Sequence, residues 1–378
     1  MKYYIIAGEA SGDLHGSNLM KGLYNVDEEA DIRFWGGDKM AAVGGKMVKH
    51  YKDADFMGFV EVLMNLGKVS SNLKACKEDI LFAQPDVLIL IDYPGFNLRI
   101  AEFAKKHHIK VFYYISPKIW AWKESRIKKI KAFVDKMFVI FPFEIDFYKK
   151  HGMEVDFAGN PLLDAICQKM KEDQDRNDFV HKNSLNDKPI IALLAGSRRQ
   201  EIEKNLPLML EMIPEFPDYQ FVLAAAPSID KDYYSKFLTG TTAKIVFDQT
   251  YDCLKHARAA LVTSGTAALE TALFNVPQVV CYKANPISYH IIRQFIKVKY
   301  ISLVNLIMDA PVVKEFIQKD MNKATLKAEL DSLLHDKAYR QKMLDNYNEL
   351  KEILGGTGAS IRVAKKMHEY LKVDKSKR

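Results

Sequence analysis

The sequence has few cysteines, and none of them has the spacing of a metal site. Its 378 residues contain four, at Cys76, Cys167, Cys253 and Cys281, with no C-x-x-C pair. Scattered cysteines of this kind are typical of a reducing compartment and argue against a structural metal. We therefore expect a cytoplasmic protein that holds no metal.

Long hydrophobic runs are also absent. The apolar residues before Gly8 are too few for the core of a signal peptide, and no later run approaches the length of a membrane span. We expect a soluble protein on these grounds. Hydrophobic residues still make up 48% of the chain, which is enough for two domains that each bury a core of their own.

The chain carries a formal charge of +7 without a nucleic-acid-binding signature of the helix-turn-helix, zinc-finger or RNP type. Net charge favours an anionic partner but does not choose among nucleic acid, a phosphorylated metabolite and acidic lipid. Basic residues concentrate over 118–131, where Trp120 and Trp122 lie among them, and in a tail from Lys372 that we expect to be disordered. Basic and aromatic residues together can stack bases or anchor at lipid headgroups.

Apolar runs alternate with helical patterns along most of the chain, which predicts α/β domains with parallel sheets covered on both faces. A polar segment over 171–187 separates two groups of such runs, and a glycine-rich break over 355–358 precedes a last helical stretch. The predicted strands of the first group are 3–7, 32–35, 87–91, 111–115 and 136–140, and those of the second are 190–195, 220–225, 243–247, 259–263 and 278–282.

This order predicts two doubly wound, Rossmann-like domains that face each other across a cleft. We assign the first to residues 1–170, the second to 188–354, and a crossover helix that returns to the first domain, with a basic tail, to 355–378. Clefts between such domains are common ligand sites.

A glycine-rich loop follows the first predicted strand and reads GEASGDLHG over 8–16, before an amphipathic stretch near Ser17. It is neither G-x-G-x-x-G nor a P-loop, and it lacks the lysine that would reach phosphates. Backbone N–H groups at a helix start can meet an anionic or polyhydroxylated ligand, which makes this loop a candidate lining of the cleft. The alternative is a tight turn whose Ser11 and Asp13 only cap the helix. The candidate residues are Glu9, Ser11, Gly12 and His15.

Two small-residue turns recur in the second half, Gly196-Ser197-Arg198 and Ser264-Gly265-Thr266. Hydroxyl and N–H groups gathered at the second turn suit a diphosphate, and Glu270 could accept hydrogen bonds from ribose hydroxyls. The alternative is a capped helix with a carboxylate in its first turn. Arg198, or instead Arg199, could neutralise charge on a departing diphosphate.

Asp92 ends the apolar run over 87–91 and could act as a general base where substrates meet the sheet edge. His15 and Glu9 are rival bases, and the alternative is an aspartate that only starts the following Pro-Gly turn. Asn305 lies in an apolar run and is either a structural strap or a ligand contact, because a buried amide needs partners. The stretch over 56–69, rich in large apolar residues, is either a core helix or an interfacial docking surface.

In these residues the sequence resembles the lipid-A-disaccharide synthases, the GT-B glycosyltransferases of family 19. The resemblance covers nearly the whole chain. It rests on ordered motifs, namely AGEASGD at 7–13, GFVEVL at 58–63, IDYPGFN at 91–97, YISPKIWAW at 114–122, FPFE at 141–144, GSR at 196–198, SGTAALE at 264–270 and SLVNL at 302–306.

The resemblance implies an inverting transfer of 2,3-diacylglucosamine from UDP-2,3-diacylglucosamine to the 6-hydroxyl of 2,3-diacylglucosamine 1-phosphate, without metal or cofactor. Asp92 would be the general base and Arg198 the phosphate-neutralising residue. Peripheral association with the inner membrane and a homodimer with exchanged C-terminal segments are implied as well, and a nucleic-acid partner is not. The donor would be bound by Ser264, Gly265, Thr266, Glu270 and Asn305, with Gly196 and Ser197.

One departure from the family is visible at Asn160, where many relatives carry His; this argues against an obligatory acid or base there. Competing hypotheses are another UDP-sugar reaction on the same fold, such as undecaprenyl-linked GlcNAc transfer or UDP-GlcNAc 2-epimerisation, a nucleic-acid-binding module, and a lipid-binding protein without turnover.

Overall fold

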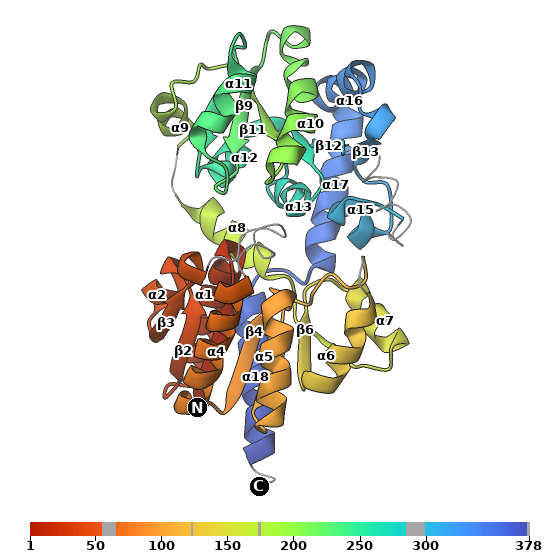
Figure 1. The fold of residues 1–378 in the computed structure, drawn as a ribbon. Coiled ribbons are helices and arrows are strands. Elements are labelled where there is room, and N and C mark those ends of the chain that lie inside the picture. The colour runs from red at the N-terminus through yellow and green to blue at the C-terminus, as the bar shows by residue number, and fades with distance from the viewer. Residues whose placement is uncertain (55–65, 122–123, 173–174, 285–298, 376–378) are drawn as a thin grey trace. The chain divides into compact units, whose positions relative to one another are not determined.

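The structure, a computed structural model, describes residues 1–378 apart from 55–65, 122–123, 173–174, 285–298 and 376–378. It divides into two compact units. The first comprises residues 1–165 and 354–378, and the second comprises residues 166–353. Both are built on a parallel sheet with helices on its faces, as the alternation of strands and helices predicted (Figure 1).

The sheet of the first unit has seven strands in the order β3-β2-β1-β4-β5-β6-β7. The short strands β3 and β7 lie at the two edges of the sheet and were not predicted. An edge strand pairs with a single neighbour and does not need a continuous apolar run. The strands are β1 (Lys2–Ala7), β2 (Asp31–Gly36), β3 (Lys46–His50), β4 (Val87–Ile91), β5 (Lys110–Tyr114), β6 (Lys136–Val139) and β7 (Asp156–Phe157).

Alternate residues of these strands enter two separate cores. Tyr3 and Ile5 pack with α1 and α18 on one face, whereas Tyr4 and Ile6 pack with α4, α5 and α6 on the other. The helices are α1 (Ala10–Val26), α2 (Asp38–Val43), α4 (Leu66–Ala83), α5 (Pro94–Lys106), α6 (Ile127–Phe133), α7 (Phe143–Lys150), α8 (Pro161–Lys171) and α18 (Ala359–Lys375), with 3₁₀ turns η1 (Tyr51–Ala54) and η2 (Glu124–Arg126).

The sheet of the second unit has six strands in the order β10-β9-β8-β11-β12-β13. They are β8 (Ile190–Leu194), β9 (Gln220–Ala225), β10 (Lys244–Phe247), β11 (Ala257–Thr263), β12 (Gln278–Tyr282) and β13 (Lys314–Ile317). The helices are α9 (Arg176–Lys182), α10 (Arg199–Leu210), α11 (Ser235–Leu238), α12 (Thr250–His256), α13 (Thr266–Leu273), α15 (Leu303–Met308), α16 (Lys323–His335) and α17 (Lys337–Ile353), with 3₁₀ turns η3 (Ile213–Glu215), η4 (Lys231–Tyr234) and η5 (Gln318–Asp320).

The polar segment over 171–187 is not simply a linker. It contains α9, in which Phe179 is fully buried. The centre of the Phe179 ring lies 5.5 Å from that of the His256 ring. Asn183, next to the end of α9, exchanges hydrogen bonds of 3.2 and 3.0 Å with Gln249. Buried contacts from only a few residues thus attach a polar sequence to the second unit.

The last helix returns to the first unit, as predicted, and lies against α1 (Figure 1). Asp164 binds its start, accepting hydrogen bonds from the backbone N–H groups of Gly358 and Ser360 at 2.5 and 2.9 Å. The helix continues to Lys375, so the part of the basic tail before residue 376 is helical rather than disordered. None of the described helices is both long and apolar enough to cross a membrane.

Candidate functional site

Two consecutive residues at the end of β4 have a backbone conformation that side chains rarely adopt. Asp92 and Tyr93 have φ angles of 42° and 48°. A non-glycine residue in this left-handed region costs about 1–3 kcal/mol and persists only where its surroundings enforce it. The turn that carries Asp92 is therefore more than the ordinary start of a Pro-Gly turn.

The side chains of Asn97 and Tyr113 enforce this turn, and both are fully buried. Asn97 donates from Nδ2 to the carbonyl oxygens of Ile91 and Asp92 at 3.1 and 2.8 Å. The hydroxyl of Tyr113 donates to the same carbonyl oxygen of Asp92. The main chain is thereby fixed in the position that holds the Asp92 carboxylate at the carboxyl edge of the sheet.

The surroundings of Asp92 shift the pKa of its carboxyl. Burial raises the pKa of its carboxyl to about 6, and the charge of Glu9 acts in the same direction. Lys118 and Arg126 lower the same pKa. A carboxylate whose pKa lies near neutral pH is well matched to the task of a general base.

The glycine-rich segment over 8–16 is a helix rather than a loop for most of its length. Helix α1 begins at Ala10 rather than near Ser17, so Gly12 and Gly16 are helical. A Cβ atom on Gly12 would lie 3.2 Å from the Cβ of Ala7, and one on Gly16 would lie 2.6 Å from Sδ of Met40. These glycines allow α1 to pack closely against its neighbours, and both are buried in the helix.

Glu9 and Ser11 are exposed at the start of α1, and the Ser11 hydroxyl donates to the Glu9 carboxylate at 2.6 Å. Asp13 is buried and accepts from the backbone N–H groups of Gly37, Lys39 and Met40 at 2.7–3.0 Å. Asp13 therefore caps α2, not α1 as the alternative hypothesis expected.

His15 is the second of the rival bases, and its pKa is shifted by burial. Burial lowers the pKa of its imidazole to about 4, and the charge that acts on it is that of Asp164. An imidazole with this pKa is neutral at pH 7. Of the two rival bases, Glu9 is the one whose charge raises the pKa of Asp92.

The turn over 264–266 in the second unit presents an open face. No heavy atom of the described residues lies within 4 Å of a Cβ placed on Gly265, and Thr266 is exposed as the first residue of α13. The Ser264 hydroxyl donates to the carbonyl oxygen of Ile301 at 2.8 Å, so it holds the turn in place. The N–H groups that begin α13 are those suited to a phosphate.

Glu270 is anchored by one of its two carboxylate oxygens. The hydroxyl of Tyr251 in α12 donates to Oε1 at 2.7 Å, and the Tyr251 ring packs 5.2 Å from that of Phe274. Burial raises the pKa of Glu270, while the Tyr251 hydrogen bond lowers it. Oε2 accepts no hydrogen bond from the described residues and is left for a ligand hydroxyl.

The turn after β8 requires its glycine, because Gly196 has a φ of 118° and a Cβ there would lie 2.6 Å from the Cβ of Glu201. The Glu201 carboxylate accepts from the Ser197 N–H at 3.0 Å and pairs with Arg198 Nη1 at 3.1 Å. The Arg198 side chain is 80% exposed, which leaves most of its donors available.

Arg199 is engaged elsewhere on the surface of the second unit. Its Nη2 pairs with Asp230 at 2.8 Å, and its guanidinium lies 4.9 Å from the centre of the Tyr233 ring. Between the two arginines that the sequence left open, these contacts favour Arg198 as the residue available to a ligand.

Asn305 is a structural strap rather than an open ligand contact. It is 1% exposed, donates to Val313 and Glu315 at 2.9 Å each, and accepts from the Val313 N–H at 2.9 Å. Asn160 is similar, since its side chain donates to Ile140 and accepts from Leu162 at 3.1 and 2.9 Å. Neither side chain has the exposure that an acid, a base or a substrate contact needs.

Four positioning residues were not found by sequence reasoning. Asn97 lies within the IDYPGFN motif, but nothing in the motif says that its amide faces the turn before it. Tyr113 lies in a strand and Tyr251 in a short helix, where the sequence pattern indicates only that an aromatic residue belongs to the core. Glu201 reads as an ordinary first-turn carboxylate.

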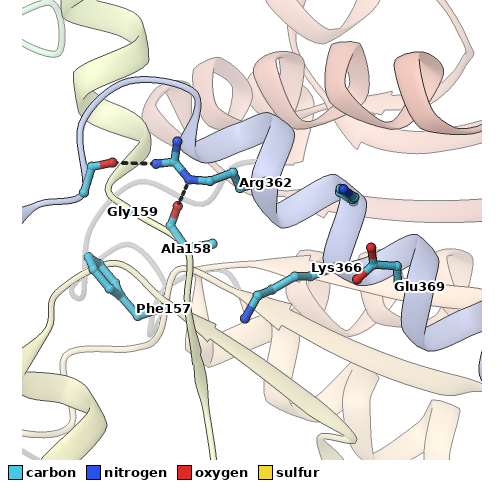
Figure 2. Close-up of a pocket in the computed structure, with 8 residues that line it drawn as sticks. Phe157, Ala158, Gly159, Arg362, Lys366 and Glu369 are labelled. Atoms are coloured by element: carbon cyan, nitrogen blue, oxygen red, sulfur yellow. Dashed lines mark hydrogen bonds between the residues drawn. The ribbon is translucent and has the colours of Figure 1, made fainter.

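A cavity of about 470 Å³ lies in the first unit beside α18, and none of the predicted site residues lines it. Figure 2 shows Arg362 reaching from α18 to the carbonyl oxygen of Ala158. Its Nε donates to that oxygen at 2.8 Å, and its Nη2 donates to the carbonyl oxygen of Gly355 at 2.7 Å. Lys366 pairs with Asp156 at 2.7 Å. These contacts hold the chain where it re-enters the first unit. The cavity is lined by Phe157, Ala158, Gly159, Gly355, Arg362, Lys365, Lys366 and Glu369.

Solved structures resemble this one over nearly the whole chain. The UDP-GlcNAc 2-epimerase from Neisseria meningitidis bound to UDP-GlcNAc superposes with a TM-score of 0.71 at 13% identity, covering 98% of this chain and all of the other. MnaA of S. aureus with UDP gives 0.72 at 16% identity, covering 98% and 97%. The calicheamicin glycosyltransferase CalG4 gives 0.60 at 14% identity, covering 98% of each chain. These likenesses confirm the predicted GT-B fold.

The sequence comparisons are closer and name a family. A family model described as lipid-A-disaccharide synthetase matches residues 3–364. The lipid-A-disaccharide synthase of Geobacter sulfurreducens is 37% identical over 366 residues, which cover 95% of this chain and 94% of the relative. That of Coxiella burnetii RSA 331 is 36% identical over 372 residues, covering 97% and 98%. The chain therefore belongs to the lipid-A-disaccharide synthase family of glycosyltransferases.

Proposed function

We propose that this enzyme transfers 2,3-diacylglucosamine from UDP-2,3-diacylglucosamine to the 6-hydroxyl of 2,3-diacylglucosamine 1-phosphate. The products are UDP and the β-1,6-linked disaccharide of lipid A. The observation that carries the proposal, within this family, is the strained turn at the end of β4 that holds Asp92 with a pKa of about 6.

In the proposed reaction, Asp92 takes the proton of the acceptor 6-hydroxyl as that oxygen attacks C1 of the donor sugar. The new C1–O bond forms on the face opposite the leaving group, so the configuration at C1 is inverted. The bond between C1 and the diphosphate breaks, and its electron pair leaves with UDP. Arg198 stabilises the charge that develops on the diphosphate.

The donor is proposed to bind on the second unit, with its diphosphate at the N–H groups that begin α13 and its ribose at Oε2 of Glu270. Gly196 and Ser197 form the turn from which Arg198 reaches the ligand. The bound UDP and UDP-GlcNAc named for the two structural neighbours support a UDP-sugar as the ligand of this fold. Asn305 contributes indirectly, because its hydrogen bond to Val313 holds the segment that follows Ile301. The Ser264 hydroxyl donates to the carbonyl oxygen of Ile301 and so depends on the position of that segment.

The acyl chains of both substrates place the reaction at a membrane surface, and we propose peripheral association with the inner leaflet. Most of the apolar stretch over 56–69, which the sequence offered for this contact, lies outside the described residues, as does Trp122. A homodimer remains a prediction, which sedimentation of the full chain at several concentrations would test.

The deciding experiment measures UDP release from UDP-2,3-diacylglucosamine in non-ionic micelles, with and without 2,3-diacylglucosamine 1-phosphate. We expect release that depends on the acceptor, together with a disaccharide product. Turnover of UDP-GlcNAc in place of this pair would overturn the proposed substrates and favour another UDP-sugar reaction.

A further inference from the structure

We propose that Arg126, together with Lys118, binds the phosphate of the acceptor next to Asp92. This inference rests on the proposed function, because it gives the phosphate of 2,3-diacylglucosamine 1-phosphate a place in the first unit. It concerns the segment between β5 and α6, for which the family resemblance assigned no substrate contact.

Arg126 is a half-buried cation whose hydrogen-bond donors are unused among the described residues. It ends the 3₁₀ turn η2 and precedes the first residue of α6. Within the described part of the chain its guanidinium forms no ion pair and no hydrogen bond, although it is not fully exposed. The Asp92 carboxylate feels the charge of Arg126 but forms no ion pair with it, so the partly buried guanidinium donors are free to bind an anion.

Lys118 is the exposed member of an otherwise packed segment. Ser116 and Ile119 on either side of it are 4% and 1% exposed. The Ser116 hydroxyl shares a hydrogen bond of 2.7 Å with that of Tyr148, and the Trp120 ring packs at 4.9 Å against that of Phe143. A rigid backbone thus presents one lysine to solvent, which lowers the entropy lost when an anion binds.

Both cations belong to the same edge of the sheet as Asp92. Strands β4 and β5 are adjacent and parallel, with Ile91 opposite Tyr114, so the segments that leave them start side by side. The backbone N–H of Asp92 donates to the carbonyl oxygen of Tyr114 at 3.1 Å, which joins the two segments directly. Both positive charges also act on the Asp92 carboxyl.

The chemistry of the acceptor requires such an arrangement. Its reacting 6-hydroxyl and its 1-phosphate belong to one hexose ring, so a base for the first and a cation for the second must lie within the span of one sugar. A forked guanidinium suits phosphate oxygens particularly well. Fixing the phosphate would orient the 6-hydroxyl towards Asp92 and so raise the rate.

The test compares Arg126→Ala and Lys118→Ala with Lys128→Ala, an exposed lysine on α6 that serves as the matched control. Two acceptors are used with saturating donor, namely 2,3-diacylglucosamine 1-phosphate and its neutral 1-methyl glycoside. We expect Arg126→Ala to lower kcat/KM for the phosphorylated acceptor about 10- to 100-fold, and Lys118→Ala several-fold. Both acceptors are assayed at about pH 8.5, where Asp92 stays ionised even without the cations that lower its pKa. With the neutral acceptor both variants should then match the wild type, and Lys128→Ala should match it throughout. Equal losses with the two acceptors, or no loss, would overturn the proposal.

Binding without turnover separates this inference from the proposed function. Calorimetric titration of the phosphorylated acceptor into donor-free enzyme should show weaker binding to Arg126→Ala than to the wild type, even if the assumed reaction is wrong. Unchanged binding would overturn the subsite. The titration and assay are repeated in micelles with added anionic phospholipid. A loss confined to those micelles would assign the two cations to membrane phosphates and contradict an acceptor site.

Discussion

The hydroxyl of Tyr251 donates a hydrogen bond of 2.7 Å to Oε1 of Glu270 and leaves the second carboxylate oxygen without a partner among the described residues. We predict that Tyr251→Phe weakens UDP binding about 3- to 10-fold, because a lost hydrogen bond to a charged group lets the carboxylate turn away from the ribose. Calorimetry with UDP and with 2′,3′-dideoxyuridine diphosphate measures this effect.

The two ligands distinguish an effect of Tyr251 on the orientation of the Glu270 carboxylate from a general loss of structure. If Tyr251 acts through the ribose hydroxyls, the dideoxy ligand should bind the variant and the wild type equally well. Tyr233→Phe is the matched control, because the Tyr233 hydroxyl donates to Glu203 at 2.7 Å on the surface of the same unit. Equal weakening of both ligands would show a structural role for Tyr251 instead.

Asp92→Asn should lower kcat about 10²- to 10⁴-fold and leave the affinity for UDP nearly unchanged, since general-base catalysis contributes rate enhancements of this size. The measurement is disaccharide formation together with UDP titration. A variant that kept the wild-type rate would return Glu9 to consideration as the base.

The pH dependence follows from the same carboxylate. A base with a pKa of about 6 is protonated below that pH, so kcat/KM should fall about tenfold per pH unit below 6 and level off above it. Glu9→Gln removes a negative charge that raises this pKa, so the acid limb should move to lower pH. An acid limb that stayed in place would mean that Glu9 does not act on Asp92.

Arg198→Ala and Arg199→Ala should differ in kind. We expect Arg198→Ala to lower both UDP affinity and kcat, because its exposed guanidinium is available to the diphosphate. Arg199→Ala removes a pair with exposed members, at 59% and 78%, and should change the free energy of unfolding by less than about 1 kcal/mol and turnover little. Steady-state kinetics on both variants decides, and a reversed pattern would move the phosphate role to Arg199.

Glu144 should make the stability of the protein depend on pH. Its carboxylate is 1% exposed and accepts from the N–H groups of Ile140 and Phe141 at 3.1 and 3.0 Å. Burial raises its pKa from 4.5 to about 7. Between these values the folded state holds the proton more tightly, so the free energy of unfolding falls as pH rises, by at most about 1.4 kcal/mol per pH unit.

Glu144→Gln is predicted to remove this part of the pH dependence. The difference between the unfolding free energies of variant and wild type, measured in urea, should therefore change between pH 4.5 and 7 and be constant above 7. A difference that stays constant from pH 4.5 to 7 would contradict the raised pKa.

Gly22 should tolerate no side chain, because its helix α1 lies against α18 at this position. A Cβ there would lie 2.9 Å from the Cβ of Ala364 and 3.0 Å from the carbonyl oxygen of Ser360. We expect Gly22→Ala to destabilise the protein by about 1–3 kcal/mol, seen as a lower Tm. Gly67→Ala, where no described heavy atom lies within 4 Å, is the control and should be neutral or stabilising by up to about 1 kcal/mol.

Much of the fold could be predicted from local pattern. Strands such as β4 and β9 are continuous apolar runs, because both faces of a parallel sheet are covered, and their bounds agree with the expected ones. The edge strands β3 and β13 were missed because they bury less of their length. Helices α16 and α17 are separated at Asp336, a break that no glycine or proline in the sequence marks.

The sequence by itself determined the alternation of strands and helices, the family, and the positions at which Asp92, Arg198 and Glu270 leave their strands or enter their helices. These features depend on local hydrophobicity and on residues close together along the chain. Only the tertiary structure decided what Gly12 and Asp13 do, and which partners hold the candidate residues. Tyr113 is 21 residues from Asp92, and Tyr251 is 19 from Glu270, and hydrogen bonds over such separations exist only once the sheet has brought its edge segments together.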